Sequence, residues 1–142
     1  MSKQKLSAQD YLSQAYRIDQ RINSKIEQAQ SLRALAEKAF ATLTKTPKNK
    51  NKNIHHTENI IVKMADLETE INKDLNRLVD LKREIFTVVG CVEPVELQTL
   101  LELRYLAFRT WEQIAVELCF DLRHVYRLHG RALAEVELVR RA

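Results

Sequence analysis

Residues 110–134 read TWEQIAVELCFDLRHVYRLHGRALA, and their spacing decides the fold of the C-terminal part of the chain. Thr110 and Gln113 have the TxxQ spacing of a capping box, in which the hydroxyl and the amide bind free backbone N–H groups at a helix start. We therefore predict a short helix from Trp111. A second helix should follow, capped by Asp121 and continuing to the end of this stretch.

The small and apolar side chains of the same stretch have the spacing of two short helices that cross. Ala115 provides a small side chain at the crossing, Cys119 falls at the turn, and Val125 reaches the shared core. The rest of that core is predicted to be Ile114, Leu118 and Leu128. This is helix-turn-helix spacing. The turn position is most often glycine in such motifs, because it frequently needs a positive φ, so Cys119 departs from the pattern.

The second of these helices carries a basic face. If Val125, Leu128 and Ala132 face inward, its cationic side chains lie largely on the open side. Arginine can hold phosphates or form bidentate hydrogen bonds to guanine in the major groove. We predict that Arg123 and Arg127 contact base edges. Phosphates or flanking bases are predicted to be contacted by His124, Tyr126 and Arg131. The alternative is a solvated charged face on a plain helical hairpin.

On the N-terminal side of this stretch, a further helix is predicted from Pro94 to Phe108. Its buried residues should be Leu97, Leu100, Leu101, Tyr105 and Phe108. The preceding helix is predicted to end within residues 90–93, since glycine suits a helix C-cap and proline is tolerated in the first turn of the next helix. Residues 91–142 are therefore expected to form a three-helix domain of the helix-turn-helix class.

Two long amphipathic stripes precede this domain, with apolar or small residues at steps of three and four. The first stripe is Tyr11, Ala15, Ile18, Ile22, Ile26, Ala29, Leu32, Ala36, Ala39 and Leu43, and the second is Ile60, Met64, Leu67, Ile71, Leu75, Leu78, Leu81, Ile85 and Val88. Residues 1–90 are predicted to form a long antiparallel helical hairpin with coiled-coil-like packing and a flexible basic loop at 44–56. Pairing with a second chain would satisfy the same stripes, so a homodimer through the hairpin stays open.

The composition supports an all-α fold, because the 142 residues include two Gly and two Pro and are 45% apolar. No signal peptide or membrane-spanning segment is apparent, so a cytoplasmic protein without a membrane partner is expected. Up to Asn59 there are 11 Lys and Arg against 5 Asp and Glu, whereas from Ile60 onward there are 12 against 14. Any DNA contact in the C-terminal half must therefore come from a local cluster of arginines.

Other candidate sites are weaker. Nonspecific contact with the DNA backbone is predicted for Lys45, Lys48, Lys50 and Lys52, with a solvated hairpin tip as the alternative. His55 and His56 are adjacent and therefore point apart on a helix, so no metal site is predicted. Cys91 and Cys119 lack a close partner, which favours buried free thiols over a disulfide or zinc site. No catalytic or phosphate-binding motif is present, so neither an enzyme nor a cofactor is predicted.

The run LLELRYLAFRTWEQIAVELCFDLRHVYRLHGRAL, residues 100–133, resembles the helix-turn-helix of region 4 in sigma-70 factors. With the preceding hairpin, nearly the whole chain resembles a family of small sigma-like proteins from phages and prophages of Gram-positive bacteria. The specific parts are RYLAFRTWEQIA, residues 104–115, and HVYRLHGRAL, residues 124–133. The family is similar to the ArpU and RinA type of late-gene activators. The resemblance implies DNA binding near a promoter, with RNA polymerase as a further partner, but no candidate for the promoter-opening region 2 is present.

The sequence is compatible with three functions. The first is a phage-type transcription regulator that places its last helix in the major groove of double-stranded DNA. The second is a DNA-packaging component similar to a small terminase subunit, which also combines such a motif with helical oligomerisation. The third is a helical adaptor that binds only protein.

Overall fold

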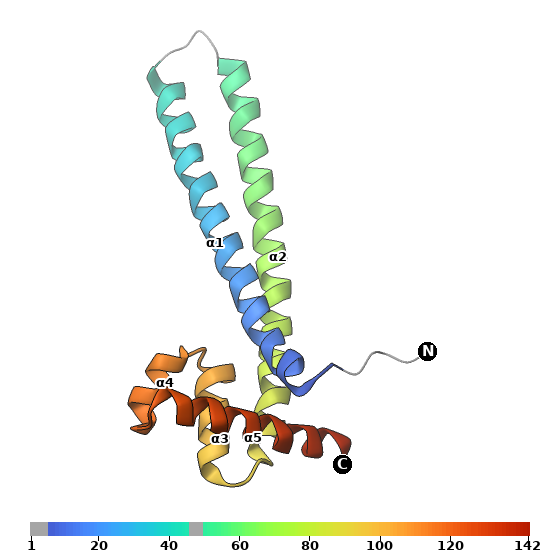
Figure 1. Ribbon diagram of the computed structural model, residues 1–142. Coiled ribbons are helices and arrows are strands. Elements are labelled where there is room, and N and C mark those ends of the chain that lie inside the picture. The colour runs from blue at the N-terminus through green and yellow to red at the C-terminus, as the bar shows by residue number, and fades with distance from the viewer. Residues whose placement is uncertain (1–5, 46–49) are drawn as a thin grey trace. The chain divides into compact units, whose positions relative to one another are not determined.

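The computed structural model describes residues 6–45 and 50–142, with side chains described for 6–41 and 55–142. Throughout these residues the regular structure is helical, and no strand occurs in them, which confirms the all-α fold class. The helices are α1 (Ala8–Lys45), α2 (Lys50–Gly90), α3 (Val95–Leu101), α4 (Trp111–Leu118) and α5 (Leu122–Arg141), with a π-helical turn, η2 (Glu102–Leu106), directly after α3 (Figure 1). Two compact units share these helices: Asp19–Arg77, and the chain up to Ile18 together with Leu78–Ala142.

Within Asp19–Arg77, α1 and α2 run side by side in opposite directions (Figure 1). The side chains that face the neighbouring helix are buried or half-buried and recur alternately four and three residues apart, which is a heptad seam. The seam consists of Lys25, Ala29, Leu32, Ala36 and Ala39 on α1, and of Thr57, Ile60, Met64, Leu67, Ile71 and Asp74 on α2. The predicted pair of long helices is confirmed.

An ion pair occupies one level of this seam. The Lys25 ammonium donates to Asp74 Oδ2 over 2.7 Å, and Glu70 Oε2 lies 3.7 Å from the same nitrogen. The hydrogen bond from Lys25 lowers the pKa of Asp74, and this carboxyl is therefore ionised at neutral pH although it is buried. Because a buried charge is costly unless it is paired, this contact fixes the relative register of the two helices.

Two members of the predicted stripes do not lie in the seam, so their prediction was wrong. Ile26 and Leu75 were expected to face the partner helix, but their side chains are 38% and 41% exposed. Lys25 and Asp74, one residue before each, take the seam positions instead. The reason is geometric: neighbouring residues differ by only about 100° around a helix, so an apolar count at steps of three and four does not distinguish the seam from its edge.

The connection between the long helices is shorter than predicted. A loop was expected at 44–56, but α1 continues to Lys45 and α2 begins at Lys50, so residues 50–56 are helical. Asparagine and lysine are tolerated in helices, and the sequence contains no proline or glycine between Pro47 and Gly90 that would stop one.

The second unit is built around α5. α3 and α4 both pack against α5, and α2 ends at Gly90, within the predicted segment 90–93. The ends of both long helices belong to the same unit and contribute buried residues to it, in addition to those of the three short helices. The largest of its fully buried side chains are Leu12, Ile85, Val89, Leu97, Leu100, Leu101, Ile114, Val125 and Val136.

The helix predicted over 94–108 is not α-helical throughout. α3 ends at Leu101, and the π turn that follows has an N–H bond from Ala107 to the carbonyl of Glu102. Phe108 then adopts a φ of 58°, and its half-buried ring packs edge-on against Tyr16 with 5.5 Å between the ring centroids. Phe108 was expected in the core. The extra residue of a π turn shifts the register of the residues after it, and a 3.6-residue pattern does not reveal this.

Candidate nucleic-acid interface

The two helices that carry the candidate interface begin at the predicted caps. Gln113 N–H donates to Thr110 Oγ1 over 3.2 Å, and Thr110 N–H donates to Gln113 Oε1 over 2.9 Å, which completes the capping box before α4. Asp121 Oδ1 accepts the N–H of His124 over 2.7 Å at the start of α5. Both predicted helix starts are confirmed, whereas α5 continues to Arg141, beyond its predicted end.

Cys119 forms the turn between these helices. Its φ and ψ are 58° and 38°, in the left-handed region. The N–H of Phe120 bonds to the carbonyl of Ala115, and the N–H of Cys119 bonds to that of Val116, which is the Schellman pattern of a helix C-terminus. This position usually holds glycine, and a cysteine adopts the same backbone conformation here at a conformational cost.

Both thiols are exposed and free, which corrects the expectation of buried cysteines. Cys119 lies at the left-handed end of α4, where the chain turns at the surface. Cys91 follows the last residue of α2 in the next turn. The preference of cysteine for protein interiors is an average over many proteins, and the turn conformation determines exposure at these two sites.

The inward face of α5 is as predicted. Val125, Leu128 and Ala132 are buried, and Ile114 of α4 is fully buried among the core residues of the same unit. Ala115, which was expected at the helix crossing, and Leu118, which was expected in the shared core, are half-buried.

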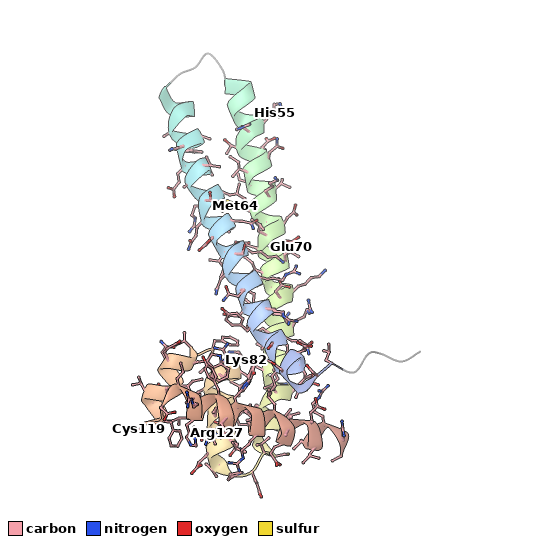
Figure 2. All side chains as sticks on the ribbon, in the orientation of Figure 1. His55, Met64, Glu70, Lys82, Cys119 and Arg127 are labelled. Carbon is pink, nitrogen blue, oxygen red and sulfur yellow. The ribbon has the colours of Figure 1, made fainter. Side chains whose placement is uncertain are left out.

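The predicted basic row lies on the opposite side of α5. Arg123, Arg127 and Arg131 recur every four residues, and all three are exposed (Figure 2 labels Arg127). Among the described side chains none of them forms an ion pair. Tyr126 is 48% exposed beside this row, whereas His124 is half-buried with its ring edge-on to Phe120. The guanidinium groups are therefore available to an anionic partner.

Comparisons with protein-family models, curated proteins and solved structures find no match for this chain. The resemblance to sigma region 4 therefore stays a prediction.

Arg104 and Trp111 support the interface through a contact that the residue pattern does not predict. The Arg104 guanidinium lies 4.4 Å from the centre of the Trp111 ring and donates to the carbonyl oxygen of Arg109 over 3.0 Å. The Trp111 ring meets Tyr126 edge-on at a centroid distance of 5.5 Å. The start of α4 is thus connected to the exposed side of α5. The only sequence signal is an arginine seven residues before a tryptophan, which is too general to be specific.

His129 supports α5 from the buried side. Its Nε2 is 2.6 Å from the hydroxyl oxygen of Tyr105, and its ring meets the Trp111 ring at a centroid distance of 4.5 Å. Burial lowers the pKa of His129 to about 4, with a further contribution from the charge of Arg104. Burial also raises the pKa of Tyr105 to about 12. Both side chains are therefore neutral at physiological pH, and neither adds charge to α5.

The remaining candidate residues do not add to this surface. The side chains of Lys45, Lys48, Lys50 and Lys52 lie outside the described residues. The His55 ring lies 3.8 Å from the Glu58 carboxylate. Among described side chains, no group of three or more His, Cys, Asp or Glu is placed to hold a metal ion. The described helices also include none with the length and apolarity needed to span a membrane.

Proposed function

We propose that α4, the Cys119 turn and α5 form a helix-turn-helix that places α5 in the major groove of double-stranded DNA. The observation that carries the proposal is the exposed row of Arg123, Arg127 and Arg131, which has no acidic partner among the described residues. A row of unpaired guanidinium groups on a helix with a capped N-terminus suits a polyanionic double helix. Arg123, in the first turn of α5, is best placed to reach base edges.

The contacts divide by chemistry. Arg123 and Arg127 form the proposed base-reading pair, because the first turns of a recognition helix enter the groove most deeply. Arg131, Tyr126 and His124 are assigned to phosphates or flanking bases. On this assignment the chain binds and does not catalyse, and it requires no cofactor.

The biological role that we propose is transcription regulation in a phage or prophage, with RNA polymerase as a second partner. This part rests on the resemblance of residues 100–133 to sigma region 4, whereas DNA binding itself rests on the exposed row.

The test selects the preferred duplex from random-sequence DNA with the purified full chain, and then measures affinity as a function of salt concentration. Arg123→Ala with Arg127→Ala should lower affinity for the selected duplex by roughly 10- to 1,000-fold and flatten the preference among sequences. Arg131→Ala should weaken binding to all duplexes alike and reduce the salt slope by about one. The matched control is Arg77→Ala with Arg83→Ala, which removes the same charge from exposed arginines elsewhere. Equal effects of the two double variants, or no salt-dependent binding, would contradict the proposal.

Two other functions are distinguishable in the same experiments. A DNA-packaging protein would form a ring of many subunits in light scattering. A protein-only adaptor would retain RNA polymerase in a pull-down while showing no affinity for any duplex.

A further inference from the structure

One side of the Asp19–Arg77 hairpin exposes apolar side chains in a regular arrangement. Ile26, Arg33 and Phe40 are seven residues apart on α1, and each directly follows a seam residue. A second row lies on α2 and consists of Ile61, Glu68 and Leu75. These residues are also seven apart, and each also directly follows a seam residue. Residues seven apart share one side of a helix in a heptad arrangement. We call these six residues the flanking face.

Both rows lie on the same side of the hairpin. On each helix, the residues of the row follow the seam residues by one position, so each row is rotated by about 100° from the side that faces the other helix, in the same sense along the chain. Because the two helices face each other and run in opposite directions, these displacements lead to one common side. The Lys25–Asp74 contact places Ile26 and Leu75 at one end of the face, which leaves Phe40 and Ile61 at the other. Each row spans about 21 Å.

The flanking face carries most of the large apolar side chains that this hairpin exposes. Of the large hydrophobic residues that the structure shows as exposed in this unit, four belong to the face, and Phe40 and Ile61 are 64% and 57% exposed. The opposite flank is different. Its groove, with a volume of about 410 Å³, has Leu32 and Leu67 at the seam, and its other lining residues are polar: Gln28, Ser31, Lys63, Asp66 and Glu70. Apolar residues at regular intervals on an exposed helical face mark an association surface.

The charges at the centre of the face indicate its partner. Arg33 and Glu68 are exposed, and among the described side chains neither forms an ion pair. Consider a second copy whose flanking face packs against that of the first, with a two-fold axis parallel to the helices. In this arrangement, α2 of the second copy lies over α1 of the first. Arg33 then meets Glu68 of the second copy, and the reverse pair forms as well. The apolar ends also match, Ile26 with Leu75 and Phe40 with Ile61.

The other face-to-face arrangement is disfavoured by charge. A two-fold axis perpendicular to the helices, lying in the contact plane, would place α1 over α1. Arg33 would then meet Arg33 and Glu68 would meet Glu68, which is repulsive. The charge pattern therefore selects one of the two symmetric arrangements.

We infer that the flanking face binds a second copy of this chain, forming a four-helix bundle in which every neighbouring pair of helices is antiparallel. The arrangement is isologous, since each copy contributes the same surface, and it buries the four exposed apolar residues of each copy. The inference does not rest on DNA binding. It would bring two copies of the proposed DNA-reading helix into one molecule.

The first test measures the mass of the full chain by sedimentation equilibrium in the absence of DNA. Wild-type protein should be a dimer, and Phe40→Glu should raise its dissociation constant by roughly 100-fold or more, because each dimer would contain two such substitutions. Leu35→Glu is the matched control: Leu35 is 50% exposed on the opposite flank of α1, and its substitution should leave the dimer intact. A monomer at every concentration, a larger ring, or equal loss with Leu35→Glu would overturn the inference.

The second test uses charge and does not depend on how well Phe40→Glu folds. Arg33→Glu alone and Glu68→Arg alone should each weaken the dimer by on the order of tenfold, because like charges then oppose each other twice. An equimolar mixture of the two variants should form a heterodimer of wild-type strength, because both opposite-charge pairs are restored in it. Lys63→Glu, on the opposite flank, should have no effect. A mixture that associates no better than the single variants would overturn the proposed arrangement.

Discussion

At the scale of single residues, Cys119 determines how α4 gives way to α5. Its left-handed backbone closes the Schellman pattern, although a side chain with Cβ is disfavoured there. The sequence identified the turn and the departure from glycine. It did not show that cysteine would take the conformation that glycine usually takes.

Replacing this residue by glycine should stabilise the protein. Cys119→Gly removes the left-handed penalty at an exposed site, and the gain is reduced by the greater freedom of glycine in the unfolded chain. We expect the free energy of unfolding to rise by about 0.5–1 kcal/mol in urea denaturation. Cys119→Ala is the control, since it removes the thiol but keeps the penalty. A gain of the same size with alanine would attribute the effect to the thiol.

His129 should make stability depend on pH in mildly acidic solution. An unfolded histidine binds a proton near pH 6.5, whereas the folded side chain does so near 4. Between these values the unfolded state binds the additional proton, so the free energy of unfolding should fall as pH decreases from about 6.5 to 4. Because His129 is partly exposed to solvent, we expect the free energy of unfolding to fall by roughly 2 kcal/mol over this interval.

Urea unfolding as a function of pH tests this, with His129→Gln as the comparison. The variant should be less sensitive to pH over that interval. The contribution of Asp74 lies in a different interval, because its pKa is lowered and its stabilisation is lost only as pH falls below about 4. An unchanged slope in the variant between pH 6.5 and 4 would exclude His129 as the cause.

At the scale of elements, the caps determine where the candidate recognition helix begins. Asp121 occupies the N-cap position, and its carboxylate also interacts favourably with the positive end of the helix dipole. The position of Arg123 on the surface depends on this start.

Removing the cap should weaken α5 at its first turn. Asp121→Ala should lower the free energy of unfolding by about 1 kcal/mol, whereas Asp121→Asn, which retains an accepting oxygen, should cost only a few tenths. Chemical denaturation followed by circular dichroism measures both. If the proposed function holds, DNA affinity should follow the same order, because a frayed first turn no longer orients Arg123. Equal stability of the alanine and asparagine variants would show that the cap contributes little.

At the scale of the whole molecule, the start of α1 is part of the unit that carries the candidate interface. Glu137 of α5 accepts the N–H of Ala8 over 2.6 Å, and the Arg140 guanidinium lies 4.4 Å from the centre of the Tyr11 ring. Lys82 of α2 donates to the carbonyl oxygen of Leu106 over 3.0 Å. α5 therefore contacts the start of α1, and the π turn contacts α2, so this unit is held together by the ends of both long helices as well as by its own helices.

A substitution near the N-terminus should consequently destabilise the C-terminal helices. Leu12 is fully buried, and Leu12→Ala should lower the free energy of unfolding by about 3 kcal/mol. Leu35→Ala, in the same helix at a half-exposed site, should change it by less than about 0.5 kcal/mol. Trp111 is the only tryptophan, so its fluorescence reports directly on the unit that contains α4. An unchanged Trp111 transition in Leu12→Ala would show that the two ends of the chain are not energetically coupled.

Local sequence patterns are enough to predict the helical class, the two long helices, the caps at Thr110 and Asp121, and the side of α5 that is buried. These features depend on interactions between residues a few positions apart, so periodicity and capping chemistry reveal them. The exposed arginine row follows from the same local periodicity.

Tertiary structure alone decided the rest. The Lys25–Asp74 pair takes seam positions that the stripe assigned to Ile26 and Leu75, the π turn moves Phe108 out of the core, and residues near Ala8 pack against α5. Each of these depends on contacts between residues far apart in the chain, or on one extra residue in a turn. The hydrophobic spacing along a single helix does not reveal long-range contacts or an extra residue in a turn. Two helices can bury their apolar stripes in several relative registers, and these registers have similar local energies.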